Sequence, residues 1–250
     1  MKRTMNLICV LLLSSLFCAT HAQALKLKSN VIILMDFSNS YFTAERKDTA
    51  IPRNIRMLAS LIADKNDGPK KPALVQILPI TDLSEQGRPV CEFVLQRKKL
   101  LGNKKPKCGP FDQNFCSADS GQFMTYMTEE CTISAQRFKE FYSTDISGAL
   151  SLAGQLGQSQ ARKGRFLVIF SDMFEYRNPQ IPISKVDLEG FDVLVVCGAD
   201  LNNEANALKF CRGTEKEWAN QLKSLGAESV TYVLETGNWT LEVGKRFFDQ

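Results

Sequence analysis

The chain has 250 residues, with 31 Lys and Arg against 27 Asp and Glu and a hydrophobic content of 44%. This near balance of charge gives no electrostatic argument for binding nucleic acid or an anionic membrane. The one histidine, His21, lies in the segment that we expect to be removed on export. Its removal excludes Ser-His-Asp and Cys-His catalysis, and any zinc site that needs an imidazole ligand.

The N-terminus has the layout of a secretory signal peptide, which we assign to residues 1–24. A short basic start precedes a compact apolar run, and small residues then allow cleavage after Ala22 or Ala24. Cys18 offers lipidation as an alternative, but the bulky Phe17 stands where a small residue is needed. We therefore expect an exported protein, periplasmic or secreted. No later stretch is long and apolar enough to suggest a membrane span.

Residues 25–250 are long enough for one sizeable α/β domain. The continuous apolar run Asn30–Asp36 ends on a carboxylate and is typical of a central parallel strand, buried on both faces. Pro52 opens a predicted helix that extends to Asp64, with apolar side chains on one face. Two more strands are predicted next in the chain, Ala73–Ile80 and Val90–Leu95.

The regular pattern breaks over residues 96–131, which we interpret as a polar, loop-like insertion in the domain. One interpretation is a solvated loop held by disulfides. The other is a partner-facing insertion, since long ordered loops in compact domains are often functional. Under the second interpretation, an acidic partner would contact the basic residues of this stretch, which are Arg97, Lys98, Lys99, Lys104, Lys105 and Lys107.

Strands and helices alternate again after the insertion. This alternation predicts an α/β fold with a doubly wound, mostly parallel sheet flanked by helices. In chain order, the predicted elements are the helices Ser134–Tyr142 and Ile146–Leu156, the strands Arg165–Asp172 and Phe191–Cys197, the helix Lys216–Leu225 and the strand Ser229–Leu234.

Six cysteines remain after the predicted signal peptide, and an even number in an exported chain indicates disulfides. We expect Cys197 to pair with Cys211 and the other four to pair among themselves. A metal cluster is the alternative, but the chain has no Cys-x-x-Cys spacing. The disulfide candidates are Cys91, Cys108, Cys116, Cys131, Cys197 and Cys211.

Two predicted strands end on carboxylates, Asp36 and Asp172. Ligands of open parallel sheets bind outside the carboxyl ends of the strands, where both side chains would lie. Asp36 also begins a D-x-S-x-S string with Ser38 and Ser40, and residues two apart in an extended loop can point the same way. An oxygen-only cluster of this kind suits a hard cation such as Mg²⁺, Mn²⁺ or Ca²⁺.

At these residues the chain resembles the von Willebrand factor type A family, over residues 30 to 235. The metal-ion-dependent adhesion site of that family reads D-x-S-x-S, then a Thr, then an Asp, and Thr144 and Asp172 match the last two in order. The chain departs from the pattern at Tyr142-Ser143, where the family often has a Gly pair, and at Met173, where Gly is common.

The resemblance implies a binding mechanism. Ser38, Ser40 and Thr144 would ligate the metal directly, while Asp36 and Asp172 would act partly through water. A protein partner would then present a carboxylate that completes the coordination shell. The expected protein is thus a non-enzymatic adhesion or assembly module. We expect it to bind no nucleic acid and to have no membrane-spanning segment.

Other interpretations of the same residues remain open. The hydroxyls could only stabilise turns and helix starts, with Thr144 or Asp145 as the N-cap of the next helix, which would leave a structural subunit with a vestigial site. Asp145 could instead supply a carboxylate that supports the metal ligands without binding the metal itself. A phosphohydrolase of the haloacid dehalogenase type also begins from an Asp that ends a strand. It needs a second Asp two residues later, where this chain has Ser38.

Overall fold

The computed structural model describes most of the chain after the predicted signal peptide. The signal peptide, the basic residues of the insertion, Cys108 and Cys116 lie outside the described residues. No described helix has the length and apolar character that crossing a membrane requires. The described ranges are 29–63, 73–95, 117–118, 120–160, 164–176, 184–198, 204–235 and 239–243.

The described strands form one seven-stranded sheet in the order β4-β3-β2-β1-β5-β6-β7. Neighbouring strands run parallel except for β2 and β3, which are antiparallel. The predicted fold class, a doubly wound and mostly parallel sheet flanked by helices, is confirmed. The strands are β1 (Ser29–Asp36), β2 (Ala73–Ile80), β3 (Cys91–Leu95), β4 (Ser117–Ala118), β5 (Arg165–Ser171), β6 (Phe191–Cys197) and β7 (Ser229–Leu234).

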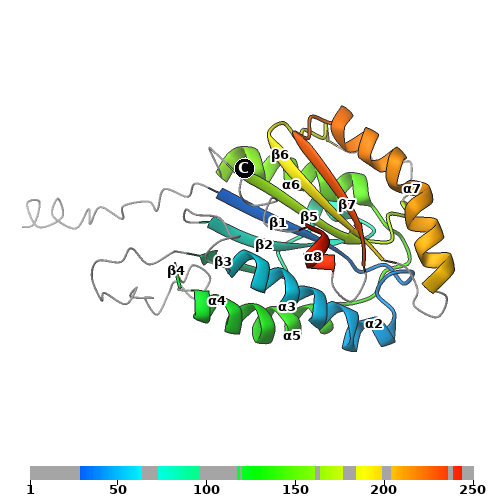
Figure 1. Ribbon diagram of the computed structural model, residues 1–250. Coiled ribbons are helices and arrows are strands. Elements are labelled where there is room, and N and C mark those ends of the chain that lie inside the picture. Colours follow the sequence, from blue (N-terminus) through cyan, green and yellow to red (C-terminus); the bar gives the residue numbers. More distant parts are fainter. Residues whose placement is uncertain are drawn as a thin grey trace, which may run out of the picture.

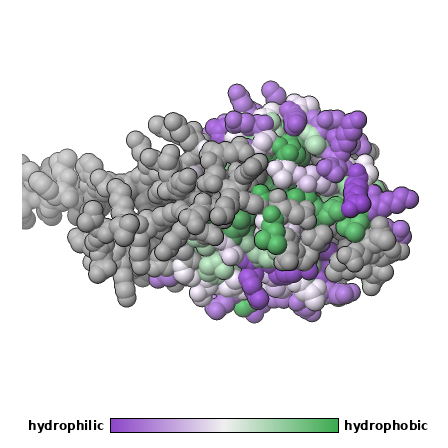
Figure 2. Space-filling model, viewed as in Figure 1, coloured by the Kyte–Doolittle hydropathy of each residue, from purple (hydrophilic) through white to green (hydrophobic). Residues whose placement is uncertain are grey.

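Helices cover both faces of the sheet (Figure 1). One apolar core lies under α3, α4, α5 and α8, and a second lies under α6 and α7. On the face that Figure 2 shows, the described surface over α7 is largely hydrophilic. The helical elements are α2 (Ala44–Asp48), α3 (Ala50–Ala63), η1 (Ser84–Gln86), α4 (Ser120–Tyr126), η2 (Met127–Cys131), α5 (Thr132–Gln136), α6 (Ile146–Gln160), α7 (Glu204–Ser224) and α8 (Trp239–Val243).

Strand β1 lies at the centre of the sheet and is buried along its whole length. Its side chains alternate between the two cores, with Val31 in the first and Ile32 in the second. The pairing of Met35 with Phe170 of β5 fixes the register. Because parallel strands end at the same edge, Asp36 and the residues after Phe170 emerge together there.

The loop predicted for the end of the insertion is wrong, because residues 120–136 are helical from α4 through η2 to α5. Phe123, Met127, Cys131 and Ala135 are buried at intervals of four residues and form the inner face of this helical segment. Polar residues between them concealed the spacing. The predicted helix Ser134–Tyr142 is also wrong beyond Gln136, where α5 ends.

Two disulfides join the described cysteines. Cys197 pairs with Cys211, as predicted, and links the end of β6 to α7. Cys91 pairs with Cys131, which agrees with the expectation that the remaining cysteines pair among themselves. This second bond ties the edge strand β3 to η2, so each core carries one covalent link between sheet and helix.

Candidate metal site

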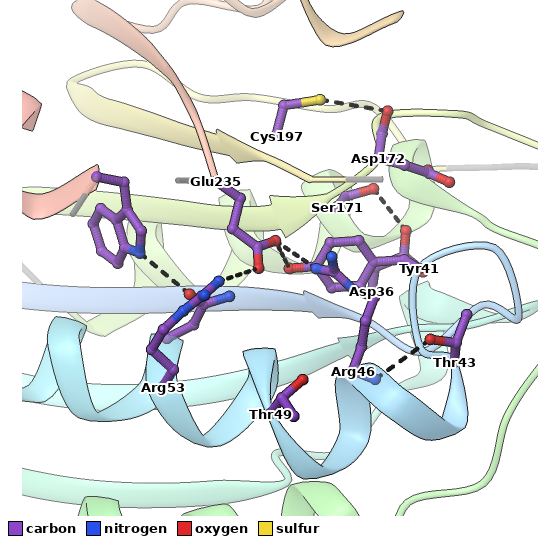
Figure 3. Close-up of polar contacts among 12 residues, drawn as sticks. Asp36, Tyr41, Thr43, Arg46, Thr49, Arg53, Ser171, Asp172, Cys197 and Glu235 are labelled. Atoms are coloured by element: carbon purple, nitrogen blue, oxygen red, sulfur yellow. Dashed lines mark hydrogen bonds and ion pairs between the residues drawn. The ribbon is translucent and has the colours of Figure 1, made fainter. Parts of the chain in front are cut away.

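The carboxylates of Asp36 and Asp172 lie at the carboxyl edge of two neighbouring central strands (Figure 3). Asp36 is the last residue of β1, and Asp172 directly follows β5. Both side chains are buried. The sheet topology therefore brings together two residues that are far apart in sequence, at the edge where ligands of such folds bind.

Asp36 is held on both carboxylate oxygens. The backbone N–H of Ser38 donates to Oδ1 at 2.8 Å, and the hydroxyl of Ser171 donates to Oδ2 at 2.6 Å. Sequence reasoning missed Ser171. Its position follows only from the register of β1 and β5, in which Met35 pairs with Phe170 and the next residues face each other. These bonds fix the orientation of Asp36 before any ligand binds.

The hydroxyl oxygens of Ser38 and Ser40 lie 3.1 Å apart. Two oxygens that ligate the same Mg²⁺ at about 2.0–2.1 Å in adjacent octahedral positions are about 2.9 Å apart, so this pair has nearly the spacing of neighbouring ligands. Backbone bonds hold their loop, since Asn39 N–H donates to the carbonyl of Phe141 and Phe141 N–H donates to that of Phe37.

The loop that carries Asp172 is held from several sides. Its Oδ1 accepts a hydrogen bond from the backbone N–H of Phe174 at 2.9 Å. Met173 has φ of 59°, so it adopts the left-handed conformation that a Gly would take with less strain. The indole N–H of Trp218 donates to the Met173 carbonyl at 2.9 Å, and Sγ of Cys197 lies 3.6 Å from the Asp172 carbonyl oxygen.

Thr144 reaches this edge through its backbone. Its N–H and carbonyl pair with Tyr176, on the segment that follows Asp172. Asp145 acts as a helix cap, because its Oδ1 accepts from the N–H of Gly148 at 2.9 Å in the first turn of α6. Its Oδ2 accepts from the N–H of Ser84. Of the two roles considered for Asp145, capping is therefore the one that its contacts support.

The electrostatics of the site are those of two buried like charges. Burial, and then the charge of Asp172, raise the pKa of Asp36 to about 7. Burial also raises the pKa of Asp172, against the lowering effect of hydrogen bonds from Phe174 and Ser40 and of the charge of Arg46. Carboxylate and hydroxyl oxygens without sulfur or imidazole are the donors that hard cations prefer, so the residues present fit such an ion.

Asp36 should make the stability of the metal-free protein depend on pH. A carboxyl with a raised pKa holds its proton more tightly in the folded chain, so its contribution to stability falls as pH rises from 3.8 to about 7. We expect Asp36→Asn to remove this decline and to be the more stable protein at neutral pH without metal. Urea unfolding of both proteins in EDTA, across that pH range, measures the difference. Parallel profiles would contradict the prediction.

Beside the site lies a buried ionic network centred on Glu235, which follows β7 (Figure 3). Its carboxylate contacts Arg46 at 2.5 Å, Arg53 at 3.1 Å and the hydroxyl of Tyr41 at 2.9 Å. Burial and the charge of Glu235 raise the pKa of Tyr41 well above its usual value, so this hydroxyl stays protonated. A Cβ at Gly198 would lie 2.0 Å from Oε2 of Glu235, so only Gly permits the approach.

No family model matches the chain, and no curated protein matches its sequence. Several solved structures resemble it at low identity. A mutant of the PilB minor pilin from Streptococcus sanguinis is 11% identical over 87% of this chain and 59% of that one, with a TM-score of 0.48. A von Willebrand factor type A structure from Catenulispora acidiphila is 13% identical over 73% and 37%, with a TM-score of 0.39.

A third is manganese-loaded TRAP protein from Plasmodium vivax, 13% identical over 90% of this chain and 75% of that one, with a TM-score of 0.40. The chain thus spans less than two thirds of the first two structures. Neither family membership nor function follows from likeness at this level.

Proposed function

We propose that this chain is an exported binding module of the von Willebrand factor type A kind, periplasmic or secreted. It engages a protein partner through a divalent cation at the carboxyl edge of its sheet. One observation carries the proposal: Asp36, Ser38, Ser40 and Asp172 converge at the ends of two central strands as an oxygen-only set. Mg²⁺ is the ion that the spacing of the two serines suits, with Mn²⁺ or Ca²⁺ as alternatives.

Each residue has a distinct part in this proposal. The hydroxyls of Ser38 and Ser40, and that of Thr144, would hold the ion directly. Asp36 already accepts two hydrogen bonds, which suits a carboxylate that acts partly through water. Asp172, which follows the neighbouring strand β5, would have the same part. A bound cation would offset the repulsion between the two carboxylates and offer an exchangeable position to a carboxylate of the partner.

Calorimetric titration of Mg²⁺ and of Mn²⁺ into metal-stripped protein tests the proposal. We expect saturable binding at one site. Its affinity should be at least about tenfold weaker in Asp36→Asn, because the substitution removes a negative charge that attracts the cation. A smaller heat of binding without a change of affinity would not count as loss.

Asp192→Asn is the matched control. Asp192 is also a buried aspartate with a raised pKa, but it lies near the start of β6, where Ser229 donates to it at 2.5 Å. It therefore lies toward the opposite end of the sheet from the site. Unchanged metal binding in this control would assign the effect to the site. Absence of binding in the wild type would reduce the predicted ligands to loop and helix stabilisers, as in a structural subunit with a vestigial site.

Enzymatic activity is not part of the proposal. A haloacid dehalogenase-like phosphohydrolase needs a second carboxylate two residues after the strand-ending Asp, to serve as acid and base. Here that position is Ser38, whose hydroxyl contacts Ser40. A hydroxyl with an ordinary acidity does not replace a carboxylate in proton transfer near neutral pH, which disfavours the phosphohydrolase.

A further inference from the structure

Large hydrophobic side chains are exposed beside the candidate metal site. Four of those that the described residues expose belong to segments that frame the site, and we call them the aromatic rim. Isolated exposed apolar residues are common on proteins, but a group of aromatic ones at one edge indicates an interaction surface. The rim consists of Tyr142, Phe174, Tyr176 and Phe210, with exposed fractions of 89%, 51%, 64% and 38%.

The backbone places three of these rings around the site. Phe174 donates its N–H to Asp172, and Tyr176 pairs with Thr144. Tyr142 follows Phe141, which forms a β-bridge with Ser38. The rim therefore approaches the predicted ligands from both the Ser38 loop and the Asp172 loop.

In the segment from Phe174 to Tyr176, the acidic side chain is bonded to the protein, whereas the two aromatic side chains are exposed. Glu175, between the two aromatics, accepts a hydrogen bond from the N–H of Ser147 at 2.8 Å, in the first turn of α6. One oxygen of its carboxylate is thus bonded to the start of the helix. The two neighbouring rings stay exposed, and the only acidic group between them is engaged.

Phe210 joins the rim from a separate element. It lies on α7, and its ring centroid is 6.3 Å from that of Phe174. The next residue, Cys211, is bonded to Cys197, whose Sγ lies 3.6 Å from the carbonyl oxygen of Asp172. A covalent link therefore holds this end of α7 against the site loop, which fixes part of the rim in place.

We propose that the aromatic rim binds apolar side chains that flank the carboxylate of the partner, so that the ligand is a protein segment with an acidic residue between hydrophobic ones. This inference rests on the proposed function. One carboxylate exchanging with water at a hydrated cation carries little selectivity, because every protein surface offers carboxylates. Aromatic residues are the side chains that most often dominate binding energy at interfaces, and here they are continuous with the metal site.

Three capped peptides serve as probes, each titrated in Mg²⁺ and followed by NMR chemical shifts. Their sequences are Gly-Leu-Asp-Leu-Gly, Gly-Gly-Asp-Gly-Gly and Gly-Leu-Asn-Leu-Gly. We expect the first to bind about tenfold more tightly than the second, since burial of apolar surface on the rim adds to the carboxylate contact. The third, which lacks the carboxylate, should bind far more weakly than the first.

Tyr142→Ala and Phe210→Ala should each reduce the preference for the Leu-flanked peptide several-fold. Calorimetric Mg²⁺ binding should be unchanged, because both side chains are exposed and lie outside the hydrogen bonds that hold the predicted ligands. Leu241→Ala is the control, because Leu241 is as exposed as the rim residues but lies on α8, outside the loops of the site. If the Leu-flanked and Gly-flanked peptides bind equally, or if neither binds, the proposed role of the aromatic rim is wrong. Retained Mg²⁺ binding would in that case still support the metal site. Equal binding of the Asn peptide would overturn the proposed role of the rim too. Loss of Mg²⁺ binding in the wild type would instead contradict the proposed function.

Discussion

Glu235→Ala is expected to destabilise the protein by about 3–5 kcal/mol, the cost of removing one member of a buried ion pair. The side chains of Arg46 and Glu235 are almost completely buried, and Glu235 also accepts from Arg53 and Tyr41. Without the carboxylate, the buried charge of Arg46 loses its ion pair with Glu235, while the face of the Tyr41 ring stays 4.1 Å away. Urea unfolding at neutral pH measures the loss.

Glu140→Ala is the control for this variant. Glu140 pairs with Lys47 at 3.9 Å, and both side chains are partly exposed, so the loss should be under about 1 kcal/mol. Equal losses in the two variants would show that burial is not what makes the Glu235 network matter. Because the network includes Tyr41, close to Ser38 and Ser40 in the chain, Glu235→Ala should also lower the affinity for Mg²⁺.

Replacing Cys91 and Cys131 together with Ala is expected to cost roughly 4 kcal/mol on the chain-entropy model. The bond closes a loop of 40 residues and ties β3 to η2. Without it, the unfolded chain gains conformations, and the helical segment from α4 to α5 loses its covalent link to the sheet. Thermal and urea unfolding under non-reducing conditions measure the change.

The matched variant replaces Cys197 and Cys211 with Ala. That bond closes a loop of only 14 residues, for which the same model gives roughly 3 kcal/mol. Both pairs are buried, so the loss of sulfur packing is similar in the two variants. A larger loss for the shorter loop would indicate that Cys197 stabilises chiefly through its contact with the Asp172 loop, and not through the unfolded chain.

The sheet could be predicted well from the sequence, because buried parallel strands consist of continuous apolar runs. Ala73–Ile80, Phe191–Cys197 and Ser229–Leu234 were predicted with the bounds that the structure has. Helices were harder. The predicted helix from Lys216 missed the first part of α7, which begins at Glu204, because Gly213 and several polar residues interrupt its apolar face. Polar spacing likewise concealed α4 and η2.

For the site, the motif located Asp36, Ser38, Ser40 and Asp172, which the structure brings to one edge. Its occupation by metal stays a prediction. Ser171 was not predicted, because its role depends on strand register and not on any local pattern. Residues such as Arg46 and Glu235 are 189 positions apart, and nothing in either neighbourhood indicates that they meet. Motifs record local spacing, whereas partners across strands are set by topology.

The hydrogen bond from Ser171 to Asp36 spans 135 positions of the chain. Contacts with such large separations form slowly, because the entropy of closing the intervening loop is lost before the contact stabilises anything. The two halves of the candidate site therefore cannot meet until β1 and β5 have paired. A partly folded chain would therefore lack the cation site. The gain of metal affinity during refolding would report the time at which the sheet is complete.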